Sequence, residues 1–496
     1  MTHKNRLQTI AALSFAATAL VSASEAFAQA PPLNESIVIG AWTFRPSLEA
    51  RLRGEYRRDA FQLGGTTLYM SDAVLGDGYQ SNVPPVGGTH AAANTTDVWS
   101  IQERIRLGIA VDRGPVTAVL KMQDARVLGS SVTSLTATGN SVTPPSFGLA
   151  PFEAYIDVHA RSGRAMFLRL GRQAVQWGDG RLIGTNDFTA TGRALDAARA
   201  GVEAGDFDFE AMAALLGLPG FASIGATAAT AASNASNTTP PATTGSQLYG
   251  LHITGHFLPL LQVEAVGLAR IVRQPVGLYL TPSDTYVADL RISGEHRGFR
   301  YSVEGAYELG QVASYGALRQ IQAPAAAARF EWETALPWHF TVGAQGAYAS
   351  GDDGTSDAKK AMTRFDPILP DETINHSRMS LYAWSNVIEA GADLGIRPAD
   401  EVMIGAGYRF VGLANPKGRW ITGALQTIGS SPTNESIFLG QEVDATVKVT
   451  PWDPVAFQLG YGLFLPGDGG KKILQDSGRP ADMQHYGYLQ VVVKAP

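Results

Sequence analysis

Hydrophobic and polar residues alternate with a period of two along many segments of this chain. Between residues 44 and 57 the even positions are mostly apolar, whereas the odd positions carry four arginines and two glutamates. Segments 286–293, 299–308 and 442–449 repeat the alternation. Successive side chains of a β-strand point to opposite faces, so the pattern predicts strands with one apolar and one ionic face. An ionic face this dense favours a water-filled interior over the core of a soluble sandwich.

The connections between the predicted strands alternate between short and long. Short, Pro- or Gly-rich turns are expected near residues 112–115, 161–164, 205–206, 258–260, 296–298, 336–338, 398–400 and 451–454. Longer loops are expected at roughly 60–97, 127–151, 175–195, 217–246, 272–284, 311–324, 350–383, 412–437 and 466–484. A soluble β-repeat protein could have similar strand spacing, but no motif recurs at a fixed period. We therefore predict an all-β fold, a transmembrane antiparallel up-and-down β-barrel of about 18 strands.

The composition and the N-terminus favour an exported membrane protein. Charged residues make up 17% of the 496 residues, which is low for a soluble domain, and cysteine is absent. Lys4 and Arg6 precede an apolar run at 10–21 and a small-x-small site at 26–28. Residues 1–28 are thus predicted to be a signal peptide and residues 29–496 one barrel domain in the bacterial outer membrane. No later stretch is apolar for the length of a transmembrane helix, and a closed barrel also satisfies every backbone group in lipid.

Gly, Asp and Arg are concentrated between two predicted strands, in residues 170–199. By composition alone this stretch is a surface turn held by ion pairs. The order of its residues is more specific and resembles the alginate export family of bacterial outer-membrane β-barrels. The resemblance is carried by Gly171, Arg172, Gln173, residues 178–184, Asp187, Gly192, Arg193, Asp196, Ala197 and Arg199, with further matches at 124–126, 350–353, 364–370, 440–444 and 464–468.

The resemblance implies a monomeric barrel of about eighteen strands with an arginine-lined pore that passes an acidic polysaccharide. The partners that we expect are an anionic saccharide or other small anionic solute, outer-membrane lipid and lipopolysaccharide, and the barrel assembly machinery. Nucleic acid is not expected as a partner.

Strand parity and the 170–199 stretch together give candidate pore-lining residues. Guanidinium groups suit carboxylates, and rings of arginine in a confined pore favour anions. Carboxylates fall on the same faces, so these charges could instead pair into a ladder that braces the wall. A selective anion path needs some arginines unpaired. The candidates are Arg51, Arg53, Arg104, Arg106, Arg169, Asp179, Arg181, Arg193, Asp196, Arg199, Arg291, Arg300 and Arg409.

Three functions stay open at this point. We favour passive diffusion of an anionic solute, such as alginate or a related acidic oligo- or polysaccharide. A general or small-metabolite porin is the alternative. A barrel enzyme acting on lipid or polysaccharide is disfavoured, because the chain has no Gly-x-Ser-x-Gly elbow and its Gly-rich loop lacks the ending of a phosphate loop. No cofactor is expected, although Asp352, Asp353 and Asp357 are weak candidates for a structural calcium site.

The loop at 174–195 is predicted to fold inward and to help form the constriction. It carries Trp177, Leu182, Ile183 and Phe188, which need a dry surface. Its charged residues, Asp179, Arg181, Asp187, Arg193 and Asp196, are expected to anchor it to Arg169 and Arg199 on the adjoining strands. The rival interpretation is an outward loop packed on neighbouring loops.

Overall fold

The computed structural model describes residues 36–59, 97–129, 149–160, 165–217, 246–258, 260–272, 283–314, 317–353 and 359–495. The predicted signal peptide lies outside the described residues, as do most of the long loops expected at 60–97, 127–151, 217–246 and 272–284. The cleavage site and the domain boundary therefore stay predictions.

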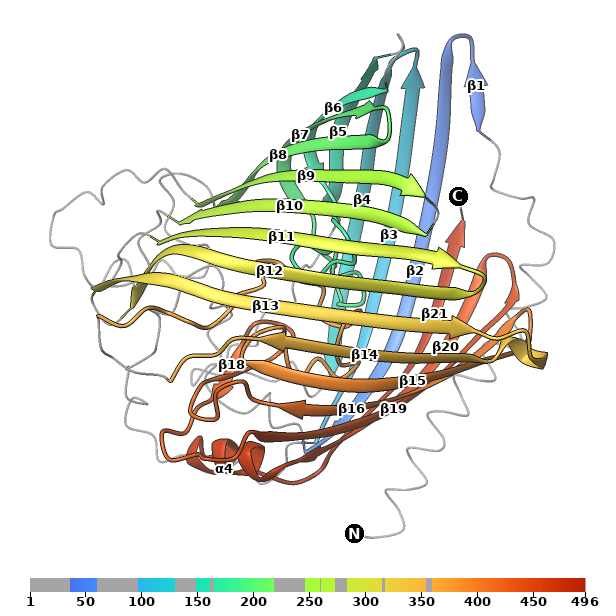
Figure 1. Ribbon diagram of the computed structural model, residues 1–496. Helices are drawn as coiled ribbons and strands as arrows, with labels where there is room; N and C mark the ends of the chain where they lie inside the picture. Colours follow the sequence, from blue (N-terminus) through green and yellow to red (C-terminus); the bar gives the residue numbers. More distant parts are fainter. Residues whose placement is uncertain are drawn as a thin grey trace, which may run out of the picture.

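Antiparallel strands form one closed wall (Figure 1). Each strand pairs with its neighbour along the chain, and the first long strand pairs with the last, which closes the barrel. Within the described residues the sheet has 19 strands, and all but the short β1 make up the wall, which confirms the predicted eighteen. The wall strands are β2 (Trp42–Arg58), β3 (Val98–Arg113), β4 (Val116–Gly129), β5 (Ala150–Ala160), β6 (Met166–Gln173), β7 (Leu195–Ala204), β8 (Phe207–Gly217), β9 (Ser246–Leu258), β10 (Leu261–Val272), β11 (Ser283–His296), β12 (Phe299–Ser314), β13 (Ala317–Glu333), β14 (Thr341–Ala349), β15 (Val387–Ala399), β16 (Val402–Gly412), β19 (Phe438–Trp452), β20 (Val455–Pro466) and β21 (Gln484–Ala495).

The remaining elements are short and are not part of this ring of long strands. Strand β1 (Ile37–Ile39) pairs with the start of β2, where β21 no longer reaches, and so continues the line of β21. The connections hold η4 (Pro337–His339), the small sheet of β17 (Trp420–Ile421) and β18 (Thr427–Gly429), and α4 (Asp468–Asp476). No helix in the described part of the chain is long and apolar enough to cross a membrane.

Short turns join the strands at one rim, as the sequence predicts. The β11–β12 turn shows why two residues suffice, because Arg297 and Gly298 both have positive φ (50° and 80°), the geometry that matches the twist of a hairpin. One expected long loop is wrong. Strand β12 runs to Ser314 and β13 begins at Ala317, so most of 311–324 is strand. Side chains there point alternately inward and outward, with Ile321 buried and Leu318 exposed, which is the pattern of a strand with small residues.

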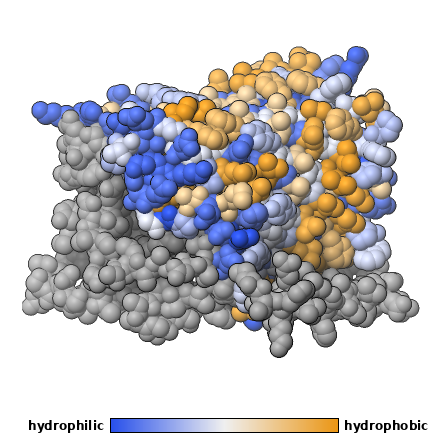
Figure 2. All heavy atoms as spheres, turned by 90° about the horizontal axis from the view of Figure 1, so that it is seen from below, coloured by the Kyte–Doolittle hydropathy of each residue, from blue (hydrophilic) through white to orange (hydrophobic). Residues whose placement is uncertain are grey.

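The two faces of the wall differ as the alternation predicts. Large apolar side chains are exposed on the outer face, for example Leu52 (52%) and Leu290 (51%), and Figure 2 shows such side chains gathered in patches. The inward positions of β2 carry Arg51 and Arg53, which are 5% and 1% exposed. An apolar exterior with a polar interior is the arrangement of a barrel in lipid.

A hydrophobic core lies inside the barrel, where loops from the rim opposite the short turns pack against the wall. It joins residues of the β6–β7, β14–β15 and β16–β19 loops to inward side chains of the wall. Among its most buried members are Ile183, Phe365, Trp384 and Trp420, each at most 1% exposed. The interior is therefore packed in part with protein rather than lined only by charged side chains.

Candidate functional site

The β6–β7 loop (residues 174–194) enters the barrel and crosses it. Near its start, Trp177 stacks on His252 of β9 with ring centroids 5.3 Å apart. Further on, Arg181 forms an ion pair with Glu304 of β12 (3.1 Å). Residues 187–191 then contact β2 and β3, which lie half-way round the barrel from β12. The predicted inward placement is confirmed, and the rival outward placement is wrong.

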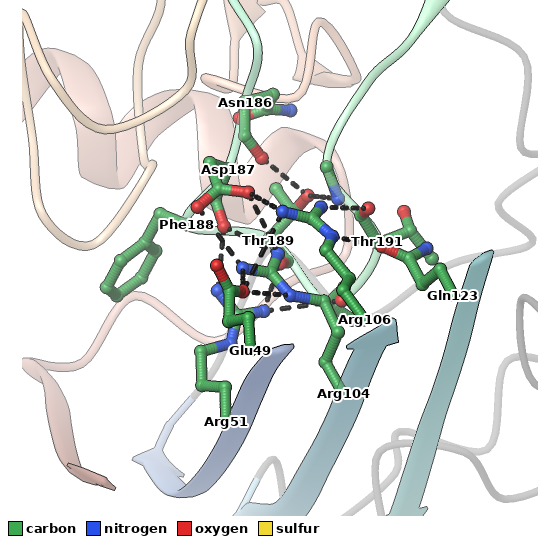
Figure 3. Close-up of polar contacts among 12 residues, drawn as sticks. Glu49, Arg51, Arg104, Arg106, Gln123, Asn186, Asp187, Phe188, Thr189 and Thr191 are labelled. Carbon is green, nitrogen blue, oxygen red and sulfur yellow. Dashed lines mark hydrogen bonds and ion pairs between the residues drawn. The ribbon is translucent and has the colours of Figure 1, made fainter. Parts of the chain in front are cut away.

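Four inward arginines on β2 and β3, Arg51, Arg53, Arg104 and Arg106, bind the far end of this loop, and we call them the arginine cluster. Figure 3 shows Arg51, Arg104 and Arg106 directed at the loop. Their side chains are almost completely buried, because the loop lies across them. Backbone carbonyl oxygens of the loop accept hydrogen bonds from their guanidinium groups: Arg51 Nη1 to Asp187 O (2.7 Å), Arg53 Nη1 to Phe188 O (2.6 Å), Arg104 Nη1 to Asp187 O (3.0 Å) and Arg106 Nη2 to Thr191 O (3.0 Å). A fixed fork of donors suits this use, since each guanidinium can hold several acceptors at once.

The carboxylate of Asp187 lies between two members of the arginine cluster. Its Oδ1 is 2.7 Å from Arg106 Nη1 and 3.1 Å from Arg104 Nη1. Burial alone raises the pKa of Asp187, but the two guanidinium groups outweigh that effect and hold its pKa well below the ordinary value. The side chain is nevertheless 46% exposed, whereas those of Arg104 and Arg106 are 2% and 7% exposed. Solvent in the lumen therefore reaches the carboxylate but hardly reaches its partners.

Carboxylates predominate on the opposite side of the lumen. Among the described residues, four carboxylates and two guanidinium groups gather there, and most of them line one small cavity beside the loop. Arg181 is 3.2 Å from Asp179 and 4% exposed; burial lowers its pKa, but the surrounding carboxylates outweigh this and raise it. The members of this acidic group are Asp179, Glu264, Asp289 and Glu304, with Arg181 and Arg291 as the cations.

The β14–β15 loop comprises residues 350–386, of which the structure describes 350–353 and 359–386. It is joined to the β6–β7 loop by several contacts. Ile183 and Leu369 form a parallel β-bridge. Arg193 Nη1 donates to the carbonyl oxygens of Leu369 (2.5 Å) and Pro370 (2.9 Å). Burial of this guanidinium lowers the pKa of Arg193. The two loops therefore form one connected body inside the barrel.

The other candidate arginines pair across neighbouring strands. These pairs form the ladder of opposite charges along the wall that the sequence analysis gives as the alternative to unpaired arginines. The pairs are Arg169 with Asp157 (2.9 Å), Arg199 with Glu210 (2.7 Å), Arg291 with Glu264 (2.5 Å), Arg300 with Glu331 and Arg409 with Asp393 (2.6 Å).

Two predicted features of the loop are corrected by these contacts. Arg169 and Arg199 do not anchor it, because each is held by a carboxylate of an adjacent strand. Asp196 forms an ion pair with Arg172 (2.9 Å). Both side chains lie on the same face of their strands as the exposed apolar residues, which is the outer face of the wall. Asp196 therefore does not line the pore, since side chains one position apart on a strand face opposite ways.

The calcium candidates do not converge in the described structure. Asp353 forms an ion pair with Lys360 (3.1 Å), and nearby Asp366 pairs with Arg270 (2.8 Å). Asp357 lies outside the described residues. No group of three or more His, Asp or Glu side chains in the described part of the chain is arranged to hold a metal ion.

The partners supplied by the β14–β15 loop were missed by the sequence reasoning. Asn375 donates to the carbonyl oxygen of Asp179 (2.9 Å), and Asn186 donates to Glu372 (2.6 Å). The available signal is the density of large apolar residues at 365–384, within the long loop expected at 350–383. Such a loop needs a dry surface, as the same reasoning concluded for residues 174–195.

Comparisons with known proteins agree with this geometry. Three solved structures share the fold: OccAB2 of Acinetobacter baumannii (TM-score 0.52, 11% identity, 90% of this chain and 97% of that one), OccK5 (OpdH) of Pseudomonas aeruginosa (0.51, 10%, 91% and 98%), and OccK2 (OpdF) of P. aeruginosa in complex with glucuronate (0.51, 10%, 91% and 96%). No curated protein sequence matches the chain. The sequence model of the alginate export family matches residues 88–215 and 281–477, which is more than half of the chain. The chain therefore belongs to the alginate export family.

Proposed function

We propose that this outer-membrane channel passes an anionic solute by passive diffusion, with an acidic oligo- or polysaccharide as the solute class. The observation that carries the proposal is the arginine cluster. Within the described residues it brings four guanidinium groups together with three carboxylates, those of Glu49, Glu55 and Asp187, and Lys494 also pairs with Glu49 (3.5 Å). The positive groups therefore outnumber the carboxylates on that side of the lumen. Confined positive charge attracts carboxylate-bearing solutes and repels cations.

The position of the β6–β7 loop supports the same proposal. Because the loop spans the lumen from β12 to β2 and β3, a solute has to pass beside it. A solute that follows the β2–β3 side meets the surplus positive charge and the exposed edge of Asp187. The loop and the arginine cluster together are therefore the proposed constriction, with the Asp187 side chain facing the lumen and the buried arginines directly behind it.

The test is the reversal potential of the purified protein in planar lipid bilayers under a salt gradient. Anion preference is expected, together with reduction of the current by glucuronate, a probe chosen because OccK2 (OpdF) was crystallised with it. Cation preference would defeat the proposal. Glucose, which is neutral and of similar size, serves as the matched control and should change the current far less than glucuronate does.

A general porin for small metabolites is the second candidate, and the acidic group favours it. Arginines on one side of the lumen and surplus carboxylates on the opposite side produce a field across the pore, which orients polar solutes of either sign. Free passage of neutral sugars, with little preference between anions and cations, would favour this candidate. Contacts with lipopolysaccharide, recognition by the assembly machinery and a monomeric state stay predictions.

A further inference from the structure

We infer that Asp187 occupies the place of a solute carboxylate in the arginine cluster, so that an anionic sugar opens its own path by displacing the loop. The inference rests on the proposed function. A carboxylate held by two guanidinium groups is the contact that a uronate group would make with the same side chains. Asp187 makes that contact from within the chain, with Arg106 at 2.7 Å and Arg104 at 3.1 Å.

The exposure of Asp187 allows a solute carboxylate to replace it as the partner of Arg104 and Arg106. Arg104 and Arg106 are buried by the loop, but the Asp187 side chain that covers them is 46% exposed. An incoming carboxylate can therefore approach Asp187 from the lumen and compete for the same donors, without the barrel wall having to open first. Arg106 also donates through Nε to Gln123 (2.7 Å), which keeps the guanidinium in place while its partner changes.

The remaining contacts of the loop end are replaceable by the same kind of ligand. Arg51 and Arg53 donate to backbone carbonyl oxygens of residues 187–190 in this loop, and the Arg53 guanidinium also lies over the Phe188 ring, 4.0 Å from its centroid. Carbonyl oxygens are neutral acceptors, and an ionised acceptor makes the stronger hydrogen bond with a guanidinium. A polymer with several carboxylates could thus replace the Asp187 contact first and the carbonyl contacts next. A neutral sugar lacks the charge to begin this exchange.

The experiment compares Asp187→Asn with the unaltered protein in planar bilayers and includes Asp196→Asn as the matched control, since Asp196 lies on the outer face. Removing the resident carboxylate should raise the conductance measured without solute. It should also lower the glucuronate concentration that halves the current by about fivefold, the equivalent of one partly exposed charge pair worth about 1 kcal/mol. Asp196→Asn should leave both quantities unchanged.

A second readout follows the loop itself. The chain has no cysteine, so Ala190→Cys gives a single site for an environment-sensitive fluorophore in the loop end. Glucuronate should shift its emission and glucose should not, and Asp187→Asn should produce part of the shift without any solute. If the half-blocking concentration and the emission stay unchanged in Asp187→Asn while anion preference persists, the inference fails and the proposed function stands. Cation preference in the unaltered protein overturns both.

Discussion

Replacing Arg181 with glutamine should release the middle of the β6–β7 loop from the barrel wall. The Arg181 side chain is 4% exposed, and its partner Glu304 on β12 is 6% exposed. Removing one partner of a buried ion pair costs about 3–5 kcal/mol, because the other charge is left without compensation. Trp384 of the β14–β15 loop, whose ring centroid is 5.5 Å from the guanidinium carbon, also loses a cation–π contact.

The cost falls on loop docking rather than on the barrel, because the wall is held by its own continuous ladders. At about 1.4 kcal/mol per factor of ten, the ratio of docked to released loop should fall by more than about 100-fold. Single-channel conductance in planar bilayers should rise, with larger fluctuations of the open-channel current. The heat-modifiable gel shift that reports a folded barrel should be retained.

The matched control is Arg172→Gln, which removes an arginine of the outer face that pairs with Asp196 at 2.9 Å. It should leave conductance within the scatter of the unaltered protein, because exposed ion pairs contribute little. Unchanged conductance and unchanged current fluctuations in a correctly folded Arg181→Gln protein would refute the reasoning, since the buried pair would then not hold the loop.

Three further outcomes are expected. Ile183 and Leu369 are β-bridge partners in a chain without cysteine, so Ile183→Cys with Leu369→Cys can form a single disulfide between the two loops. The disulfide should lower conductance until a reductant restores it. Equal conductance of the cross-linked and the reduced protein would show that the loops do not move relative to each other. The pKa of Asp187 is lowered in the folded loop, so its contribution to docking is complete above the ordinary value of about 4 and is lost only as pH falls through the lower folded value. The difference in conductance between Asp187→Asn and the unaltered protein should therefore be the same at pH 5 as at pH 7, and a difference that is already smaller at pH 5 would contradict the pairing. Leu52→Arg on the outer face should destabilise the barrel by about 2–4 kcal/mol in urea unfolding from lipid vesicles, and equal midpoints would mean that Leu52 does not face lipid.

The barrel could be predicted because its rules are local. The alternation in residues 44–57 places Arg51 and Arg53 inward and Leu52 outward, and the structure has them so. Short turns with Gly or Pro could be located in the same way, since their residue types suit few backbone conformations. The error at 311–324 arose where small residues made a true strand resemble a loop.

The interior contacts could not be predicted, because they join residues far apart in sequence. Nothing near Asp187 indicates that its partners are Arg104 and Arg106, and local reasoning assigned Arg169 and Arg199 instead. The role of residues 365–384 was missed for the same reason. Burial of one loop inside a barrel depends on which other loop enters beside it, and no periodicity in either sequence states that.

The connection between the two inner loops has a consequence for the order of assembly. Asn186 binds Glu372, and Arg193 binds Leu369, across separations of 186 and 176 residues. The β6–β7 loop therefore cannot reach its final position until the chain has been made and inserted as far as β15, although its own strands come early. Its other anchors on β2 and β3 become part of a closed ring only when β21 pairs with β2. Completion of the interior is thus a late step, which requires strands and loops from both ends of the chain to be in place.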